Sequence, residues 1–293
     1  MKKRFFNMKF KDSTTGYLFL MPWLIGLFLF TLYPVAQSFI FSLSNVTISP
    51  TTGIGTELVG FKWYIEAFAD DATFTVSLLD TLQFILLSTP MIVVAALLLA
   101  VLLNGKFKGR TLYRAIFFFP VIIISGPVIS ELINTDAAAV IDPQNYFIYD
   151  FIESLPGILS GPLIYIFDNI VLILWFSGVQ VVMFLAGLQK IDKPTQEAAA
   201  IDGASKWQMF WKIYLPYLKP LVLLNTIFTI VVLSGFSSNK VNGEILNKMR
   251  LTGKIYSYSS ALSWIYFVIL AVMLGIAFVL LRPKKVKVKG AGL

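Results

Sequence analysis

The sequence predicts an all-α, polytopic membrane protein with six transmembrane helices. Hydrophobic residues make up 57% of the 293-residue chain and charged residues only 14%, whereas soluble domains have about 25% charged residues. Six segments reach or approach the roughly 20 apolar residues that a helix needs to cross the hydrocarbon layer. Lys and Arg are concentrated in alternate connections between these segments, as expected of a chain that crosses a bilayer repeatedly.

The six predicted spans cover residues 17–41, 81–103, 115–130, 163–188, 220–236 and 258–281. Five basic residues precede the first span, as in a signal peptide, but its apolar stretch exceeds the roughly 7–15 residues of a signal-peptide core. We therefore expect this span to be retained. The third span is short and contains Pro120 and Pro127.

The distribution of basic residues predicts the orientation. With the N-terminus in the cytoplasm, 19 of the 24 Lys and Arg residues fall on the inner side, which agrees with the positive-inside rule. Both termini and the connection 189–219 are then cytoplasmic, and the basic tail 283–293 anchors to anionic lipid. The five basic residues left outside are Lys62, Lys240, Lys248, Arg250 and Lys254. In the outer connection 42–80, we expect Trp63 and Tyr64 to lie in the headgroup layer.

Composition also excludes several function classes. The chain has neither His nor Cys, which removes the commonest metal ligand, the commonest general base and any disulfide. Apart from Asp168, near one end of the fourth, the predicted spans contain no acidic residue, so we expect no catalytic residue and no metal site. No phosphate-binding loop motif occurs, so ATP hydrolysis is not expected in this chain. The basic residues alternate with apolar runs and form no stripe for nucleic acid.

The inner connection 189–219 is predicted to form two short helices. Asp192 or Thr195 is suited to cap the first helix, and Gly203 to end it, because glycine readily adopts a positive φ. Ser205 and Gln208 have the spacing of a capping box that starts the second helix. Two prolines, at positions 216 and 220, are expected to separate this connection from span five.

Within this connection, one pattern of residues is highly specific. Glu-Ala-Ala is followed by a glycine four positions later and then, after nine residues, by Ile-x-Leu-Pro; roughly one chain in a million of this length would match by chance. The pattern resembles the EAA signature of the membrane subunits of ATP-binding-cassette (ABC) importers, within the binding-protein-dependent, MetI-like family. The resemblance implies that these residues couple the chain to an ATPase: Glu197, Ala198, Ala199, Asp202, Gly203, Ile213, Leu215 and Pro216. The alternative is an amphipathic helix lying on the inner leaflet.

The resemblance also implies the partners and the organisation of the chain. We expect a second homologous permease, two ABC ATPase subunits that hold ATP and magnesium, and an extracellular solute-binding protein, assembled in the bacterial cytoplasmic membrane. This chain itself is expected to bind no cofactor. A single permease domain is expected, with an N-terminal segment 1–73, a five-helix core 74–282 and the basic tail 283–293.

Further segments resemble the carbohydrate branch of this family, of the maltose-importer F-subunit and glycerol-phosphate-importer A-subunit type. They are YLFLMPWL at 17–24, KGRTLYR at 108–114, FLAGLQ at 184–189 and SSALS at 259–263. The chain departs from the Gly-Gly-Pro turn that relatives often carry between spans five and six, since residues 237–244 read SSNKVNGE. A sugar or oligosaccharide is the implied cargo. Glycerol phosphate or a polyamine is an alternative, and a secondary transporter is a more distant one.

Polar side chains inside the spans are candidates for a substrate path. An amide or hydroxyl that faces lipid without a partner is costly, so each must meet another helix or a wet channel. We predict that Ser177, Gln180, Asn225 and Thr229 line the pore, although hydrogen bonding between helices is an equal alternative for each. The neighbouring Trp175 and Phe176 are suited either to stack on a sugar ring or to pack between helices.

Overall fold

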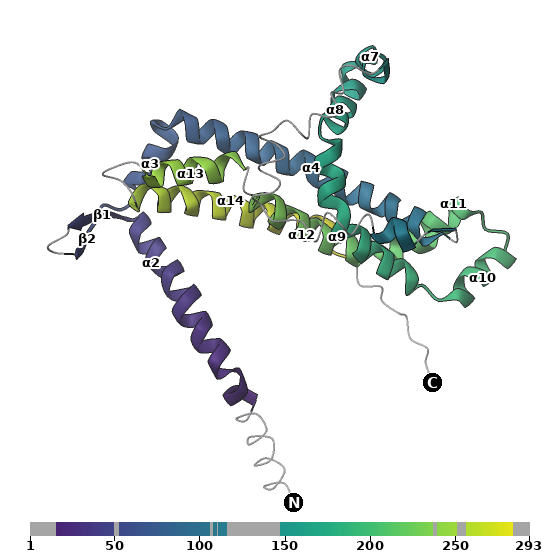
Figure 1. Ribbon diagram of the computed structural model, residues 1–293, viewed down its shortest axis with the longest axis horizontal. Coiled ribbons are helices and arrows are strands. Elements are labelled where there is room, and N and C mark those ends of the chain that lie inside the picture. Colours follow the sequence, from purple (N-terminus) through teal and green to yellow (C-terminus); the bar gives the residue numbers. More distant parts are fainter. Residues whose placement is uncertain are drawn as a thin grey trace, which may run out of the picture. The chain divides into compact units, whose positions relative to one another are not determined.

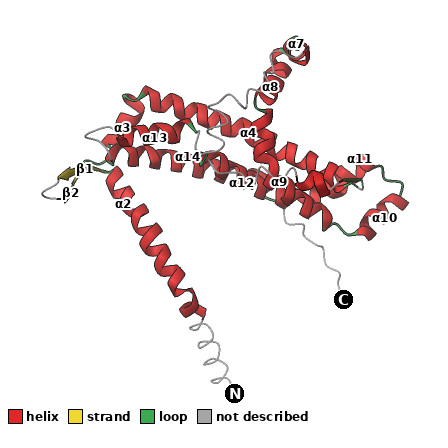
Figure 2. Ribbon diagram, in the orientation of Figure 1, coloured by secondary structure: helices red, strands yellow, loops and turns green. Residues whose placement is uncertain are grey.

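The computed structural model describes residues 16–49, 53–105, 108–109, 111–115, 147–236, 239–250 and 256–283. These residues are mostly helical, with one two-stranded sheet (Figures 1 and 2). Within this part of the chain, five helical stretches are long and apolar enough to cross a membrane: Gly16–Ser42, Ala72–Asn104, Leu172–Gln189, Lys206–Ser234 and Ser257–Leu281. The chain is thus a mostly helical membrane protein. The third predicted span, 115–130, lies outside the described residues except at its first position.

The chain divides into two compact units, which are described separately. The first comprises residues 1–75 and 244–268, and the second comprises residues 76–243 and 269–293. Three helices contribute residues to both units: α4 (Ala72–Asn104), α13 (Lys240–Arg250) and α14 (Ser257–Leu281).

The first unit begins with a long helix that contains a π-helical segment, Phe28–Leu32, directly before α2 (Tyr33–Ser42). At the junction, the N–H of Tyr33 donates to the carbonyl of Phe28, five residues earlier. Pro34 follows immediately, and its ring lacks an N–H and crowds the carbonyl four residues before it. The wider turn accommodates the proline without ending the helix.

A short hairpin and a helix follow α2 within the outer connection 42–80. Strands β1 (Ser44–Ser49) and β2 (Gly53–Leu58) pair antiparallel, and α3 (Lys62–Ala69) comes next. Trp63, which was expected to lie in the headgroup layer, has its side chain buried within the protein. Its side chain is only 3% exposed, and its indole N–H donates to the carbonyl of Ser44 at 3.0 Å. Its ring contacts that of Tyr258 edge-to-face, with centroids 6.0 Å apart, so both the ring and its polar group have partners inside the protein.

Asp71 is the polar centre of the first unit. One carboxylate oxygen accepts hydrogen bonds from the hydroxyl of Thr73 at 2.6 Å and the N–H of Phe74 at 3.0 Å, which caps the start of α4. The other oxygen lies 2.8 Å from the ammonium of Lys248 on α13 and accepts a 2.8 Å bond from the hydroxyl of Tyr258 on α14. One side chain therefore ties together the ends of three helices.

The same contacts determine the ionisation of Asp71. Burial alone would raise the pKa of its carboxyl group, but the bonds from Lys248, Thr73, Phe74 and Tyr258 outweigh burial and hold the pKa well below its usual value. Lys248 is one of the basic residues that the charge rule left outside. Its ion pair with Asp71 provides a structural reason for a positive charge at that position.

The second unit contains the remaining parts of α4, α13 and α14 together with the helices α7 (Phe147–Glu153), α8 (Gly157–Asp168), α9 (Ile170–Gln189), α10 (Lys193–Ile201), α11 (Lys206–Met209) and α12 (Leu215–Ser234). One hydrophobic core joins α4, α9 and α12 around Phe184 and Leu218, both fully buried. Close packing there depends on Gly187, since an added Cβ would lie 2.2 Å from a methyl carbon of Leu221.

The fourth predicted span is not one continuous helix. The chain breaks at Asn169, whose backbone leaves helical geometry at φ −109° and ψ 12°. Both its N–H and its side-chain amide donate to the carbonyl of Tyr165, at 3.1 and 3.0 Å. These local bonds end α8, and α9 starts anew at Ile170. Side-chain competition of this kind does not alter hydropathy, so the apolar stretch appeared continuous in the sequence.

We predict that Asp71→Asn destabilises the protein by about 2–3 kcal/mol, because it removes an ion pair and weakens the cap of α4. Thermal unfolding of the purified protein in detergent measures this loss. Because the folded pKa is lowered, the stabilisation from Asp71 is present at neutral pH and is lost only as the pH falls below about 4.

Asp70→Asn is the matched control, since this neighbouring carboxylate is exposed. It should change stability by no more than about 0.5 kcal/mol. Equal effects of the two substitutions would contradict a special role for Asp71.

Candidate functional site

The segment between α9 and α12 carries the residues of the Glu-Ala-Ala pattern, and α10 forms its first part. The backbone of Asp192 is extended, and Lys193 and Pro194 begin the helix after it. Asp192 rather than Thr195 therefore occupies the capping position, although its side chain forms no capping hydrogen bond. The side-chain amide of Gln196 donates to the carbonyl of Ile191 at 3.2 Å, which holds the first turn of α10 against the end of α9.

Gly203 ends α10, as the sequence predicted. Its φ is +77°, a left-handed conformation in which a side chain is strained. The N–H of Gly203 donates to the carbonyl of Ala200 at 3.1 Å, and the N–H of Ala204 donates to the carbonyl of Ala199 at 2.9 Å. This pair of bonds is a Schellman motif, which satisfies the last carbonyls of the helix.

The predicted capping box of the second helix is also confirmed. The hydroxyl of Ser205 accepts from the N–H of Gln208 at 3.2 Å, and the Gln208 side chain accepts from the N–H of Ser205 at 2.9 Å. These reciprocal bonds start α11 immediately after the turn at Gly203.

The expectation that Pro216 and Pro220 separate this segment from span five is wrong. Helix continues from Lys206 to Ser234, through a π-helical segment, Phe210–Tyr214, that directly precedes Pro216. The N–H of Leu215 donates to the carbonyl of Phe210, five residues earlier. As before Pro34, a wider turn absorbs the proline, so the inner segment and the membrane-crossing part of α12 form one continuous helix.

Exposure divides the residues of the pattern into two groups. The first part is a surface: Glu197, Ala198, Asp202 and Gly203 are exposed. In the second part, Ile213 and Leu215 are half-buried, and Ile213 packs against the core that joins α4, α9 and α12. The part with small side chains and carboxylates is thus exposed on the surface of the protein. The apolar part packs against the helices α4, α9 and α12 and holds the segment in place.

Two apolar features add to this surface: Ile201, and the tryptophans that the sequence places toward one end of the segment. Ile201 is 86% exposed, next to the Gly203 turn. Trp207 and Trp211 are 69% and 49% exposed and contact each other edge-to-face, with ring centroids 5.5 Å apart. The exposure of Ile201 could have been predicted, because it is a branched apolar residue at the end of an otherwise polar helix. Exposed apolar groups of this kind are typical of surfaces that contact another molecule.

The four residues proposed to line a pore lie on α9 and α12, and all are at most 1% exposed in the isolated chain: Ser177, Gln180, Asn225 and Thr229. The amide of Gln180 donates to the hydroxyl of Thr229 at 2.8 Å, and this hydroxyl donates to the carbonyl of Asn225 at 2.7 Å. Ser177 donates to the carbonyl of Leu174 in its own helix. The structure therefore brings three of the four together.

Several polar atoms at this helix interface lack partners among the described residues. These are the carbonyl oxygen of Gln180, both side-chain polar atoms of Asn225 and the indole nitrogen of the adjacent Trp175. Phe176, in contrast, packs edge-to-face against Phe236, with centroids 5.1 Å apart. A buried amide without a partner is costly, so these atoms mark a place where water, cargo or another chain would supply hydrogen bonds.

Acidic residues do not gather into a metal site in the described part of the chain, where no group of three or more potential ligands occurs.

Comparison with known proteins relates this architecture to transport systems. Residues 73–282 match the family model described as "Binding-protein-dependent transport system inner membrane component". The probable ABC transporter permease protein YesP of Bacillus subtilis is 28% identical over 92% of this chain and 90% of its own length. The multiple sugar-binding transport system permease protein MsmF of Streptococcus mutans is 30% identical over 88% and 92%. The arabinooligosaccharides permease AraP of Halalkalibacterium halodurans is 31% identical over 79% and 70%.

Solved structures share the fold. A chain of a bacterial ABC transporter involved in the import of the acidic polysaccharide alginate superposes with a TM-score of 0.65 at 20% identity, over 95% of this chain and 99% of that chain. The alginate transporter in complex with a periplasmic protein bound to an alginate pentasaccharide gives a TM-score of 0.58 at 18% identity, over 94% and 96%.

We predict that Thr229→Val destabilises the protein by about 1 kcal/mol, because it removes the acceptor of the Gln180 amide at the helix interface. The double variant Gln180→Leu/Thr229→Val should recover part of this loss, since no amide is then left unpaired. Thermal unfolding of the four proteins of this cycle measures the coupling.

Thr226→Val provides the control, because the hydroxyl of Thr226 bonds only within its own helix, to Val222 at 2.8 Å. A coupling of zero between positions 180 and 229 would show that the interhelical bond contributes nothing.

Proposed function

Since the chain belongs to the family of binding-protein-dependent transport system inner membrane components, we propose that it is the permease subunit of an ATP-driven importer whose cargo is a sugar or oligosaccharide. Relatives named for arabinooligosaccharides and for multiple sugars support this cargo class. So does the scarcity of ionisable residues in the predicted spans, where Asp168 near the start of the fourth is the single one, because a charged solute or a coupling ion calls for such residues.

The observation that carries the proposed mechanism is the arrangement of residues 189–219. Glu197, Ala198, Asp202 and Gly203 are exposed, and Ile213 fixes the same segment to the core of α4, α9 and α12. Small side chains allow another protein's backbone to approach closely, and the exposed carboxylates offer partners for basic groups on it. We propose that an ATPase subunit docks on this surface.

The continuous helix from Lys206 to Ser234 supports mechanical coupling. When ATP draws two ATPase subunits together, the docked segment moves with them, and the helix carries that movement to its far end. Rigid-body movement of this kind is a known way of switching between two states. In this mechanism, ATPase closure opens the permease to the outside, and ATP hydrolysis resets it.

The proposed complex contains this chain, a second homologous permease, two ATPases and an external solute-binding protein, in the bacterial cytoplasmic membrane. ATP and magnesium belong to the ATPases. A structure of similar fold that includes a periplasmic protein supports the binding-protein partner. The proposed topology places both termini and residues 189–219 in the cytoplasm, where the ATPases reside, and treats residues 1–293 as one permease domain.

We predict that Glu197→Lys and Gly203→Asp each abolish sugar uptake while the protein remains in the membrane at its normal level. The first reverses a charge on the docking surface, and the second places a charged side chain where the ATPase approaches. An added Cβ at Gly203 meets no atom of this chain within 4 Å, so within the chain the substitution introduces the strain of a positive φ but no steric clash. Uptake of labelled sugar and immunodetection of the membrane fraction measure the two quantities.

Two further variants separate docking from local structure. Gly203→Asn keeps a residue that tolerates positive φ, so its uptake should still be low if close approach matters and normal if only the turn does. Thr195→Asp adds an exposed negative charge to the first turn of α10, outside the pattern, and should leave uptake unchanged. Normal uptake by Gly203→Asp would refute the docking role.

A further inference from the structure

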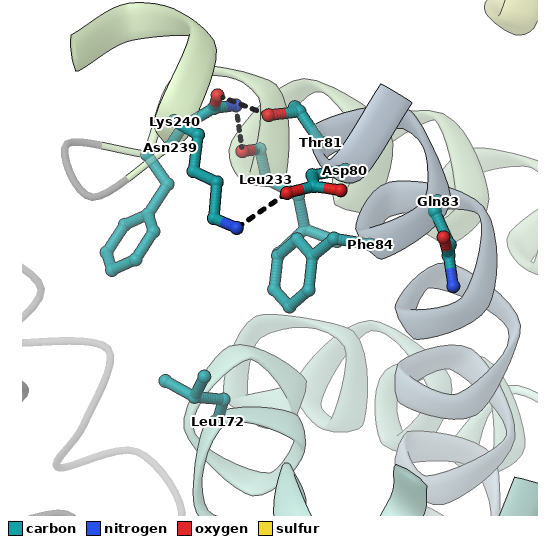
Figure 3. A pocket seen from close by; sticks show the side chains of 9 residues that line it. Asp80, Thr81, Gln83, Phe84, Leu172, Leu233, Asn239 and Lys240 are labelled. Carbon is teal, nitrogen blue, oxygen red and sulfur yellow. Dashed lines mark hydrogen bonds and ion pairs between the residues drawn. The ribbon is translucent and has the colours of Figure 1, made fainter. Parts of the chain in front are cut away.

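A cavity of about 440 Å³ lies in the second unit, where residues from α4, α9, α12 and α13 meet (Figure 3). Its size is within the range of sites for small molecules. The cavity is lined by Asp80, Thr81, Gln83, Phe84, Leu172, Leu233, Phe236, Asn239 and Lys240. The four residues proposed from the sequence to line a pore are not among them.

Two of the lining residues, Asp80 and Lys240, form an ion pair. The ammonium of Lys240 lies 2.6 Å from a carboxylate oxygen of Asp80, and their side chains are 66% and 43% exposed. Both groups therefore remain reachable from solvent. Gln83 also lines the cavity, and its exposed side-chain amide offers a further donor and acceptor.

The wall behind the ion pair is fixed by hydrogen bonds of its own. The hydroxyl of Thr81 donates to the side-chain oxygen of Asn239 at 3.0 Å, and this oxygen also accepts from the N–H of Val241 at 2.9 Å. The amide of Asn239 donates to the carbonyl of Ser234 at 3.2 Å. Thr81 and Asn239 are buried, whereas Asp80 is partly exposed and Lys240 and Gln83 are exposed, so the last three are the groups that can meet a ligand.

Apolar side chains complete the cavity. Figure 3 shows the ring of Phe84 between the Asp80–Lys240 pair and Leu172. Phe236 is held in place by its edge-to-face contact with Phe176. An aromatic face beside paired donors and acceptors matches a ring that has C–H groups on its faces and hydroxyls on its edge.

We propose that this cavity binds one ring of a neutral saccharide, with Asp80 accepting from its hydroxyls, Lys240 and Gln83 donating to its oxygens, and Phe84 packing on its face. The net charge of the pair is zero, so a neutral ligand can bind while the ion pair remains formed. An ionic ligand would pair with one of the two groups and leave the other without its opposite charge. This inference rests on the proposed function as a sugar importer. In the proposed topology the cavity lies toward the outer side, from which cargo arrives.

Occupancy is testable by thiol labelling, because the chain contains no cysteine. Gln83→Cys is prepared in the reconstituted complex with its ATPase and binding protein. The probes are maltotriose, arabinotriose and raffinose, each first assayed for uptake. We expect a transported probe to slow maleimide labelling of position 83 about fivefold or more, and a probe that is not transported to leave it unchanged. Asn247→Cys, an exposed position on α13 that does not line the cavity, should label at the same rate throughout.

Kinetics provide an independent test. Asp80→Asn and Lys240→Gln should each raise the KM for uptake of the transported probe about tenfold, the cost of losing a hydrogen bond to a charged group, with little change in kcat. The charge-swapped Asp80→Lys/Lys240→Asp variant retains an ion pair but moves each group. If the pair only fastens α13 to α4, the swap should restore a normal KM; if it binds sugar, the KM should stay high.

The outcomes distinguish the two proposals. Uptake of a probe without protection of position 83, or a normal KM in the charge-swapped variant, overturns the cavity assignment and leaves the importer function standing. If none of the saccharides is taken up by the complete complex, the proposed cargo class is refuted, and the cavity assignment is refuted with it.

Discussion

The hydrogen-bonding requirement of the peptide backbone is the constraint on which this structure depends. Inside a lipid bilayer no water is available to an unpaired N–H or carbonyl, so each crossing segment must satisfy its own main chain. The five long apolar helices meet this requirement. Two departures from ideal α-helical geometry show how the main chain stays hydrogen-bonded around prolines. Where Pro34 and Pro216 remove a donor, the preceding turn widens to π geometry and the helix continues. Hydroxyl groups contribute as well, since Ser177, Thr226 and Thr229 each donate to a carbonyl three or four residues earlier.

Local signals in the sequence were sufficient for the turns of the inner segment. Gly203 and the Ser205–Gln208 box were correctly predicted because each acts through its nearest neighbours along the chain. Hydropathy likewise located most of the long helices, since burial in lipid depends on the composition of a whole segment. The location of the Glu-Ala-Ala surface on a short helix also followed from these signals.

Features that depend on distant contacts were not predictable in the same way. Tryptophan is typical of the membrane interface, yet the side chain of Trp63 is buried and donates a hydrogen bond to the carbonyl of Ser44 in the hairpin. The break at Asn169 and the passage of helix through Pro216 depend instead on local hydrogen bonds that hydropathy does not register. The charge rule gives no reason for Lys240 and Lys248 on the outer side. In the structure each forms an ion pair with a carboxylate more than 150 residues away in the sequence, Asp80 and Asp71 respectively. Pairing of this range is a property of the fold rather than of any local pattern.

The unbroken helix from Lys206 to Ser234 has a geometric consequence. At 1.5 Å per residue its 29 residues form a rod about 44 Å long. If such a rod pivots near one end, a tilt of only about 10° sweeps the opposite end through roughly 8 Å, more than one helical turn. A small angular adjustment at Trp207 is thereby amplified at the remote end of α12. The widened turn before Pro216 keeps the helix continuous between these two ends.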